Sequence, residues 1–137
     1  MDHDAARAFI REHHRAVMAT RRGNGAPQMS IVACNIDGEG RAIVSTRETA
    51  VKTKNARRDP RVSLCILPDD GWSGQWIQVE GTAEVLSLPE AMEPLVDYYR
   101  STAGEHPDWD DYRRAMVDDQ RLLIRITVER AGPDRAG

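Results

Sequence analysis

Apolar and polar residues alternate along several short segments of the chain, and a period of two is typical of β-strands with one buried face. Residues 61–67 and 75–87 show this alternation most clearly. Two further runs flank the turn sequence RGNGAP at 22–27, and residues 41–46 and 121–130 also have strand composition. Because turn sequences join most neighbouring segments, the pattern predicts about six strands in a largely antiparallel sheet, closed into a small barrel.

A helical period predicts short helices in the remaining segments. Residues 4–16 carry apolar side chains at helical spacing, with Asp2 or Asp4 as the N-cap. Residues 48–59 predict a short helix that ends near Asp59, because the following proline disfavours a helical conformation in the residue before it. Residues 89–106 and 108–120 predict two more helices, the first with a proline in its first turn. The predicted fold class is therefore mainly β with short helices (α+β).

The composition is typical of a globular protein with one domain over residues 1–137, and a frayed tail is expected from about residue 131. The net charge of −3 argues against a protein that coats nucleic acid or an anionic membrane. No apolar run approaches the roughly 20 residues that span a bilayer, and the first residues lack the pattern of a signal peptide. We therefore expect a cytoplasmic protein without a membrane span, in which Cys34 and Cys65 are reduced, buried thiols.

Motifs for hydrolysis and metal binding are absent from the sequence. It contains no G-x-S-x-G, no H-E-x-x-H and no glycine loop with a Walker lysine. His13 and His14 are adjacent on a predicted helix, so they cannot share a metal as residues one helical turn apart could. The acidic run at 108–119 lacks the glycine that a calcium loop needs, and it predicts a helix capped by Asp108 with Trp109 in the core. No metal site and no catalytic residue are predicted.

The sequence AVKTKNARRDPRVSLCIL at 50–67 places two lysines and three arginines directly before and at the start of a predicted strand. Lys52 and Asn55 are three residues apart and share one helical face. A lysine, a threonine hydroxyl and an amide at the start of a helix are suitable phosphate donors, and the helix dipole adds to them. A solvated basic face is the simpler interpretation of composition alone, so both stay open here. Nucleic-acid binding is less favoured, because aromatic residues for stacking are few.

Longer stretches of the chain carry a family resemblance. They are ATRRGNGAPQMSIV at 19–32, VSTRETAVKTKNARRDPRVSL at 44–64, and DDGW followed by VEGTAEV within 69–85. Together they resemble the flavin- and deazaflavin-dependent split-barrel family related to pyridoxamine phosphate oxidases. The stretch YRSTAGEHPDWDDYRRAMVDDQRLLIRI at 99–126 is similar to the actinobacterial B subgroup of that family, which uses coenzyme F420. The resemblance implies a homodimer of six-stranded antiparallel split β-barrels of the FMN-binding type, with a cofactor at each subunit interface.

The resemblance also implies which residues contact the cofactor. The equivalents of Lys52 and Asn55 hold its phosphate with help from the residues between them, and the strand segment 28–32 lies along its ring system. A loop of the partner subunit, around Trp72 to Trp76, closes the pocket. The arginines that follow Asn55 suit a polyanionic cofactor tail. The expected cofactor-binding residues are Gln28, Met29, Ser30, Ile31, Val32, Ser45, Thr46, Lys52, Thr53, Lys54, Asn55, Arg58, Gln75 and Trp76.

The leading functional hypothesis is a coenzyme F420-dependent oxidoreductase. A reduced deazaflavin carries a transferable hydride, so the protein has to supply binding, orientation and exclusion of water rather than an acid–base pair. The expected acceptor is an unsaturated or quinone-like small organic molecule. Two alternatives stay open: an FMN-dependent enzyme that resembles pyridoxamine phosphate oxidase, and a non-catalytic carrier or sensor of F420.

Overall fold

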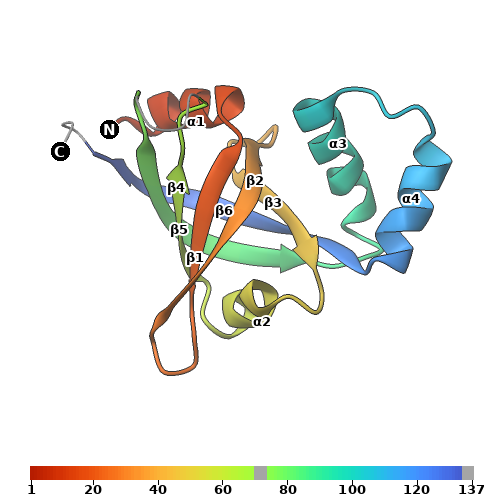
Figure 1. Ribbon diagram of the computed structural model, residues 1–137, viewed down its shortest axis with the longest axis horizontal. Helices are drawn as coiled ribbons and strands as arrows, with labels where there is room; N and C mark the ends of the chain where they lie inside the picture. Colours follow the sequence, from red (N-terminus) through yellow and green to blue (C-terminus); the bar gives the residue numbers. More distant parts are fainter. Residues whose placement is uncertain (70–73, 134–137) are drawn as a thin grey trace.

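The computed structural model describes residues 1–69 and 74–133, and its strands form a closed antiparallel barrel (Figure 1). Around the barrel the strands follow the order β1-β2-β3-β6-β5-β4, with β4 returning to β1. Every neighbouring pair is antiparallel, which confirms the predicted barrel. The strand bounds are β1 Arg15–Arg21, β2 Pro27–Ile36, β3 Ala42–Arg47, β4 Arg61–Ile66, β5 Ile77–Leu86 and β6 Arg121–Gly132.

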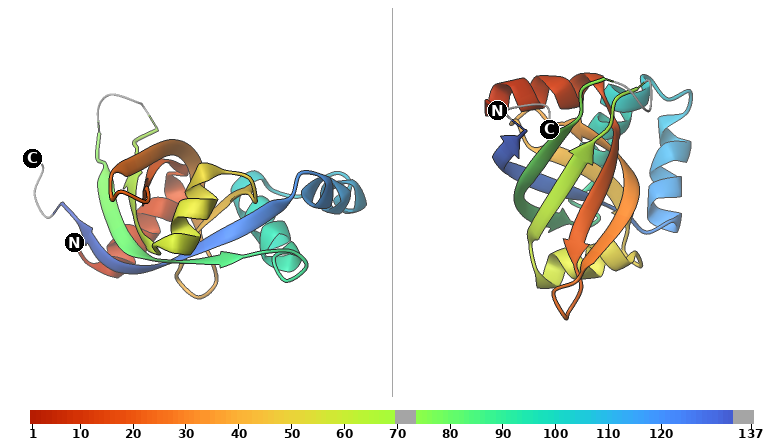
Figure 2. Two further views of the ribbon diagram at one scale, coloured as in Figure 1. Left: turned by 90° about the horizontal axis from the view of Figure 1, so that it is seen from below. Right: turned by 60° about the vertical axis from the view of Figure 1, so that its left-hand side comes forward.

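Four helices within the described residues surround this barrel: α1 His3–Glu12, α2 Val51–Arg58, α3 Met92–Ala103 and α4 Trp109–Asp118. Helix α1 covers one end of the barrel and α2 the opposite end, whereas α3 and α4 form a hairpin beside the strands (Figures 1 and 2). None of the helices in the described part of the chain is long and apolar enough to cross a membrane.

Helix α1 is shorter than the sequence predicts. Its N-cap is Asp2, whose carboxylate accepts a hydrogen bond from the N–H of Asp4, as expected. The helix ends at Glu12 instead of residue 16, because the next residues already belong to the barrel wall. The carbonyl oxygen of His14 accepts the N–H of Cys34 at 2.7 Å. The backbone after Glu12 therefore forms hydrogen bonds within the sheet, although the helical spacing of the side chains continues.

The other helix bounds follow local backbone chemistry. Helix α2 ends with Asp59 as its C-cap, as the following proline predicts. Asp108 caps α4 by accepting the N–H of Asp111, which is also as predicted. In contrast, Pro89 does not lie in the first turn of α3 but in the turn before it, because the helix begins after its N-cap Ala91.

Strand β6 continues further than expected, to Gly132. Ala131 lies opposite Val79 and Gly132 opposite Gln78 on β5, so the two residues belong to the sheet and not to a frayed tail. A register shift at Gly81 lets the long strands β5 and β6 stay paired around the curved wall. The last part of the expected tail, residues 134–137, lies outside the described residues.

Two apolar clusters stabilise the fold. The larger one fills the barrel with alternate side chains of its strands and includes Ile10 of α1. The smaller one lies outside the barrel, where Ala91 and Leu95 of the α3 segment pack against Ile43 and Leu123. This second cluster fixes α3 against β3 and β6, and so fixes the position of the helical hairpin.

Both cysteines are free, as expected. Cys34 is fully buried in the barrel, and burial raises the pKa of its thiol to about 12. Cys65 is only half-buried, which corrects the expectation that both are core residues.

Trp109 also departs from its prediction, because it is half-buried rather than part of either apolar cluster. It stacks with Tyr99, His106 and Tyr112 between α3 and α4, and the guanidinium of Arg100 lies 4.9 Å from its ring. The residue therefore holds the hairpin together at its tip.

Candidate active site

A groove of about 620 Å³ opens where strands β2 and β3 diverge. These strands pair only from Cys34 to Ile36, opposite Ala42 to Val44. Beyond this point β3 remains paired with β6 alone, while the first part of β2 remains paired with β1. The groove is bounded by β2, the end of β3, the start of α2 and the α3–α4 hairpin. The candidate site therefore lies where the barrel wall separates between β2 and β3.

The edge of β2 presents backbone donors to this groove. The N–H of Cys34 points towards β1, whereas the carbonyl of Ala33 points to the opposite side, where it accepts the hydroxyl of Tyr98 at 2.9 Å. Since successive residues of a strand direct their backbone groups to opposite edges, the N–H groups of Ile31 and Ala33 face the split. A planar ring with carbonyl acceptors fits such an edge.

The opposite end of the groove is basic. Arg47, Lys52 and Arg121 all line it. The carboxylate of Asp119 lies between the two arginines, 3.1 Å from Nε of Arg47 and 3.0 Å from Nε of Arg121. The hydrogen bond from Arg47 is the main reason that the pKa of Asp119 is lowered. Three cationic groups and this carboxylate leave the end of the groove with positive charge for an anion.

Within the described residues Lys52 forms no ion pair with a carboxylate, unlike Arg47 and Arg121. Its pKa is lowered, first by burial and then by repulsion from Arg121. Both effects disfavour the charged ammonium in the free protein, and both are offset when an anion enters the groove. Lys52 is therefore better suited to bind a phosphate than to stabilise the fold.

The turn between β3 and α2 supplies further polar groups. Thr46 and Thr49 line the groove beside Ala50, the N-cap of α2. In the described part of the chain no side chain caps the first turn of α2, so its positive end stays available to an anion next to Lys52. The hydroxyl of Thr53 donates to the carbonyl oxygen of Arg47 at 2.7 Å and ties the helix to the end of β3. The local fold thus holds the basic end in place.

Of the residues expected to bind cofactor, the groove brings five together: Ile31, Val32, Ser45, Thr46 and Lys52. Thr53 and Asn55 are not among the residues that line it and are buried. The amide of Asn55 donates to the hydroxyl of Thr20 at 3.1 Å, and its oxygen accepts Arg58 at 2.8 Å. Lys52 and Asn55 therefore do not meet at one surface in the free protein, and the phosphate role of Asn55 stays a prediction.

The remaining residues of that set lie outside the groove lining. Gln28 accepts the hydroxyl of Thr20 at 2.7 Å, Met29 is 64% exposed, and Ser30 has a buried hydroxyl without a protein partner in the described chain. Lys54 and Arg58 lie on the exposed side of α2, where Arg58 also donates to Arg21.

Gln75 and Trp76 are exposed just before β5, and Trp76 lines a separate hollow with Gln78 and Arg130. Trp72 falls outside the described residues. The expectation that this segment closes the site of a partner subunit stays a prediction.

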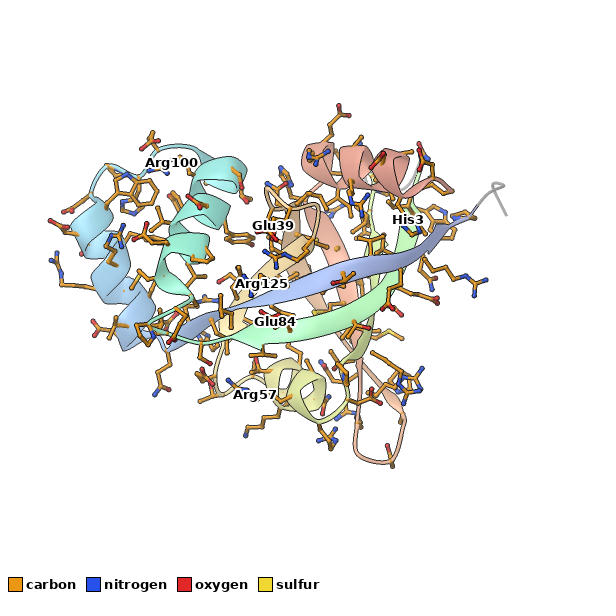
Figure 3. All side chains as sticks on the ribbon, turned by 180° about the vertical axis from the view of Figure 1, so that it is seen from behind. His3, Glu39, Arg57, Glu84, Arg100 and Arg125 are labelled. Atoms are coloured by element: carbon orange, nitrogen blue, oxygen red, sulfur yellow. The ribbon has the colours of Figure 1, made fainter. Side chains whose placement is uncertain are left out.

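The other arginines of the basic cluster have intramolecular partners. Arg57, on α2 (Figure 3), pairs with Glu48 at 2.8 Å, and Arg61 pairs with Asp59 at 2.7 Å. Asp59 therefore holds the side chain of Arg61 in place. None of these arginines is among the residues that line the groove.

Sequence reasoning missed the helical hairpin that lines one side of the groove, and two of the three cations at its basic end. Tyr98, Tyr99, Tyr112 and Met116 of the hairpin line the groove, and so do Arg47 and Arg121. Arg47 lies opposite Arg121 in the β3–β6 ladder. An arginine directly after a predicted strand and before a segment that is predicted to bind phosphate is a usable signal. The pairing of β3 with β6, which adds Arg121, is a long-range contact that no local pattern reveals.

The chain is similar in sequence and in fold to several known proteins. A curated relative, the F420H(2)-dependent biliverdin reductase of Mycobacterium tuberculosis (strain CDC 1551 / Oshkosh), is 29% identical over 129 residues, which cover 93% of this chain and 84% of the relative. A crystal structure of the conserved hypothetical protein Rv2991 from Mycobacterium tuberculosis has a TM-score of 0.77 and 24% identity, covering 96% of this chain and 82% of that one.

A solved structure described as an F420 reductase has a TM-score of 0.70 and 17% identity, covering 91% of this chain and 94% of that one. At these identities the two structures establish the shared fold alone. The family model described as pyridoxamine 5'-phosphate oxidase matches residues 2–133. That match takes in the whole barrel, the groove and the hairpin, and the chain belongs to the pyridoxamine 5'-phosphate oxidase family of split barrels.

Proposed function

We propose that the protein is a coenzyme F420-dependent reductase that binds the deazaflavin in the groove between β2 and β3. Membership of the family and the similarity to an F420H(2)-dependent reductase support an oxidoreductase activity. The observation that carries the proposal is the combination of an open β2 edge and a basic end within one groove. A planar ring and an anionic side chain need these two environments at once.

The donor set fits this cofactor. At the basic end, Lys52, Arg47 and Arg121 are positioned to bind a phosphate, together with the hydroxyls of the β3–α2 turn. At the other end, the N–H groups of Ile31 and Ala33 are positioned to orient the carbonyl groups of the ring. The tyrosines of the hairpin line the same groove, where their rings would lie beside a bound cofactor.

The chemistry needs little else from the protein. When bound, a reduced deazaflavin supplies a hydride from its central ring carbon. The side chains of the groove bind and orient, and the tyrosine hydroxyls are weak acids, because burial raises the pKa of both Tyr98 and Tyr112 to about 12. We therefore expect the product to take its proton from solvent rather than from either tyrosine.

A homodimer is part of the proposal. Met29 and Ile31 of β2 are 64% and 74% exposed, and they point outwards beside the groove. On the next strand, Val17 lies opposite Ile31 and Ala19 opposite Met29, so the apolar surface extends across β1. Exposed apolar surface of this kind next to a binding groove is typical of a subunit interface. A second copy seated there would bring its own residues to the groove.

An anaerobic turnover assay tests the reductase activity. Reduced F420 is mixed with the protein and a panel of quinones, conjugated enones and a linear tetrapyrrole, and its oxidation is followed by absorbance. We expect catalysed oxidation by at least one of these acceptors and, in a separate aerobic reaction, no catalysed oxidation by dioxygen. Oxidase activity with bound FMN would favour the flavin alternative, and tight F420 binding without turnover across a broad acceptor panel would favour a carrier. Either result would contradict the proposal.

A further inference from the structure

The point at which β2 and β3 separate has an unusual hydrogen-bonding geometry. The ladder between them ends with Cys34 opposite Val44, so the next pair in the register would be Ala33 and Ser45. Because the backbone groups of Cys34 face β1, those of Ala33 face β3. Ala33 and Ser45 would therefore form a hydrogen-bonded pair if the ladder continued. They mark the first missing rung of the barrel wall.

The side chain of Tyr98 occupies this missing rung. Its hydroxyl donates to the carbonyl oxygen of Ala33 at 2.9 Å. Burial raises the pKa of Tyr98 to about 12, and the backbone of Ser45 acts in the opposite direction, which indicates that the Ser45 N–H faces the phenolic oxygen from the side of β3. The hydroxyl thus lies between the carbonyl and the N–H that a continuous ladder would join directly. A phenol can do this because it is both a donor and an acceptor.

The packing of α3 explains why the tyrosine stays there. The ring of Tyr98 packs against the apolar cluster that contains Leu95, Ile43 and Leu123. That cluster fixes α3 to the outer face of β3 and β6, so the hydroxyl is delivered from a rigid element. At neutral pH the hydroxyl stays protonated, since its pKa is far above that range. It remains a donor to Ala33 under all ordinary conditions.

We propose that Tyr98 is a positioning residue that bridges Ala33 and Ser45 and so sets the point at which the barrel splits. Beyond the bridge, Ser45 and Thr46 remain paired only with Leu123 and Leu122 of β6. The edge of β2 is then free to meet a planar ligand. This consequence for cofactor binding rests on the proposed function, whereas the bridge itself is a property of the protein without ligand.

Hydrogen exchange of the ligand-free protein, followed residue by residue with NMR, tests the bridge. In the wild type we expect the Ser45 amide to be protected, and in Tyr98→Phe to exchange roughly tenfold faster, because it loses its acceptor. Tyr112→Phe is the matched control. Its hydroxyl also donates to a backbone carbonyl at 2.9 Å, but this carbonyl belongs to Leu95 of α3 and not to β2 or β3. We expect the Ser45 amide to be unchanged in this variant.

Two results would overturn the bridge. One is a Ser45 amide that exchanges in the wild type as fast as an amide of the exposed turn at Gly38. This measurement needs no variant, so it tests the bridge even if Tyr98→Phe folds poorly. The other is an equal increase in the exchange rate of the Ser45 amide in the two tyrosine variants.

F420 titration is a separate experiment, in which Tyr98→Phe should bind F420 several-fold more weakly than the wild type. Unchanged affinity would refute the role in cofactor binding, and a wild type that does not bind F420 would refute the proposed function without affecting the exchange result.

Discussion

Lys52 lies where β3 gives way to α2, and its ammonium faces the groove together with two guanidinium groups. Its lowered pKa arises from burial and from Arg121, so the free protein gains little from its charge. A bound phosphate reverses this balance, because charge-assisted hydrogen bonds in a partly buried groove are among the stronger polar contacts. The residue is therefore a direct probe of ligand binding, separate from folding.

We expect Lys52→Ala to weaken F420 binding by roughly 10- to 100-fold, the effect of losing a hydrogen bond to a charged group. Its melting temperature should be unchanged or slightly raised, because a repelled and partly buried cation is removed. Lys54→Ala, on the exposed side of the same helix, is the control and should keep its affinity within about twofold. Equal losses in the two variants, measured by fluorescence titration, would show that only overall charge matters.

Asp59 and Arg61 provide a prediction about pH. The side chain and backbone N–H of Arg61 lower the pKa of Asp59 from 3.8 to about 2. A lowered pKa in the folded state stabilises the protein above the unfolded-state value, and this contribution is lost as the pH falls from about 4 to about 2. In Asp59→Asn, stability should therefore fall less steeply over this range than in the wild type.

Thermal unfolding at a series of acidic pH values measures this difference. Asp110→Asn, on the exposed face of α4, is the control and should follow the wild-type curve. Parallel curves for the wild type and Asp59→Asn would contradict the assigned role of the Asp59–Arg61 pair.

At the residue scale, local sequence was enough for some of the site and insufficient for the rest. Lys52 could be predicted because a lysine in the first turn of a helix that follows a strand is a local arrangement. Asn55 shares a helical face with Lys52 only approximately, and in the structure its side chain points inwards and donates to Thr20. Arg121 and Tyr98 reach the groove from elements more than forty residues away, and only the packed barrel brings them there.

At the scale of elements, the barrel depends on the close approach of β5 and β6 at Gly81. A Cβ atom added there would lie 1.9 Å from the carbonyl oxygen of Thr127, which is backbone and cannot move aside easily. The register shift between Glu80 and Gly81 occurs at the same place. The glycine is therefore required by the bulge that bends the two long strands.

We expect Gly81→Ala to destabilise the protein by about 3 kcal/mol, as overpacking against backbone does, and to lower the melting temperature by roughly 10 °C. The control is Gly38→Ala, because the added atom would meet nothing within 4 Å. That change should stay within about 0.5 kcal/mol of the wild type, as is usual for an exposed surface site. A mild effect of Gly81→Ala in thermal unfolding would mean that β5 can slide past the bulge.

The existence of the elements could be predicted better than their ends. Alternation and turn sequences identified the six strands, since each is a local pattern of side chains. The end of α1 was placed too late and the end of β6 too early, because both are decided by ladder partners: His14 with Cys34, and Gly132 with Gln78. The narrow β2–β3 ladder, which opens the groove, also depends on pairing that the period of two does not determine.

At the scale of the whole molecule, the proposed homodimer places the exposed side chains of β2 in an interface. We expect Met29→Lys to shift the protein towards monomer, because it buries a charge in an apolar contact. Met29 is 64% exposed in the single chain and does not line the groove. The control is Val117→Lys on α4, at a residue that is 58% exposed and is not among the residues that line the groove.

Sedimentation velocity measures the outcome for both variants. The wild type and Val117→Lys should sediment as dimers, and Met29→Lys should dissociate at low micromolar concentration. A monomeric wild type would contradict the proposed homodimer. A dimer in all three proteins would show that the interface lies on another face.

The central claim is that the groove between β2 and β3 binds a deazaflavin cofactor, and a paired fluorescence titration tests it most directly. Purified protein is titrated with oxidised F420 and, separately, with FMN, at low and high salt. We expect saturable binding of F420, weaker binding of FMN, and a loss of F420 affinity with added salt, since phosphate contacts at the basic end are electrostatic. A protein that is yellow as isolated with tightly held flavin, or that saturates with FMN and not with F420, would contradict the claim.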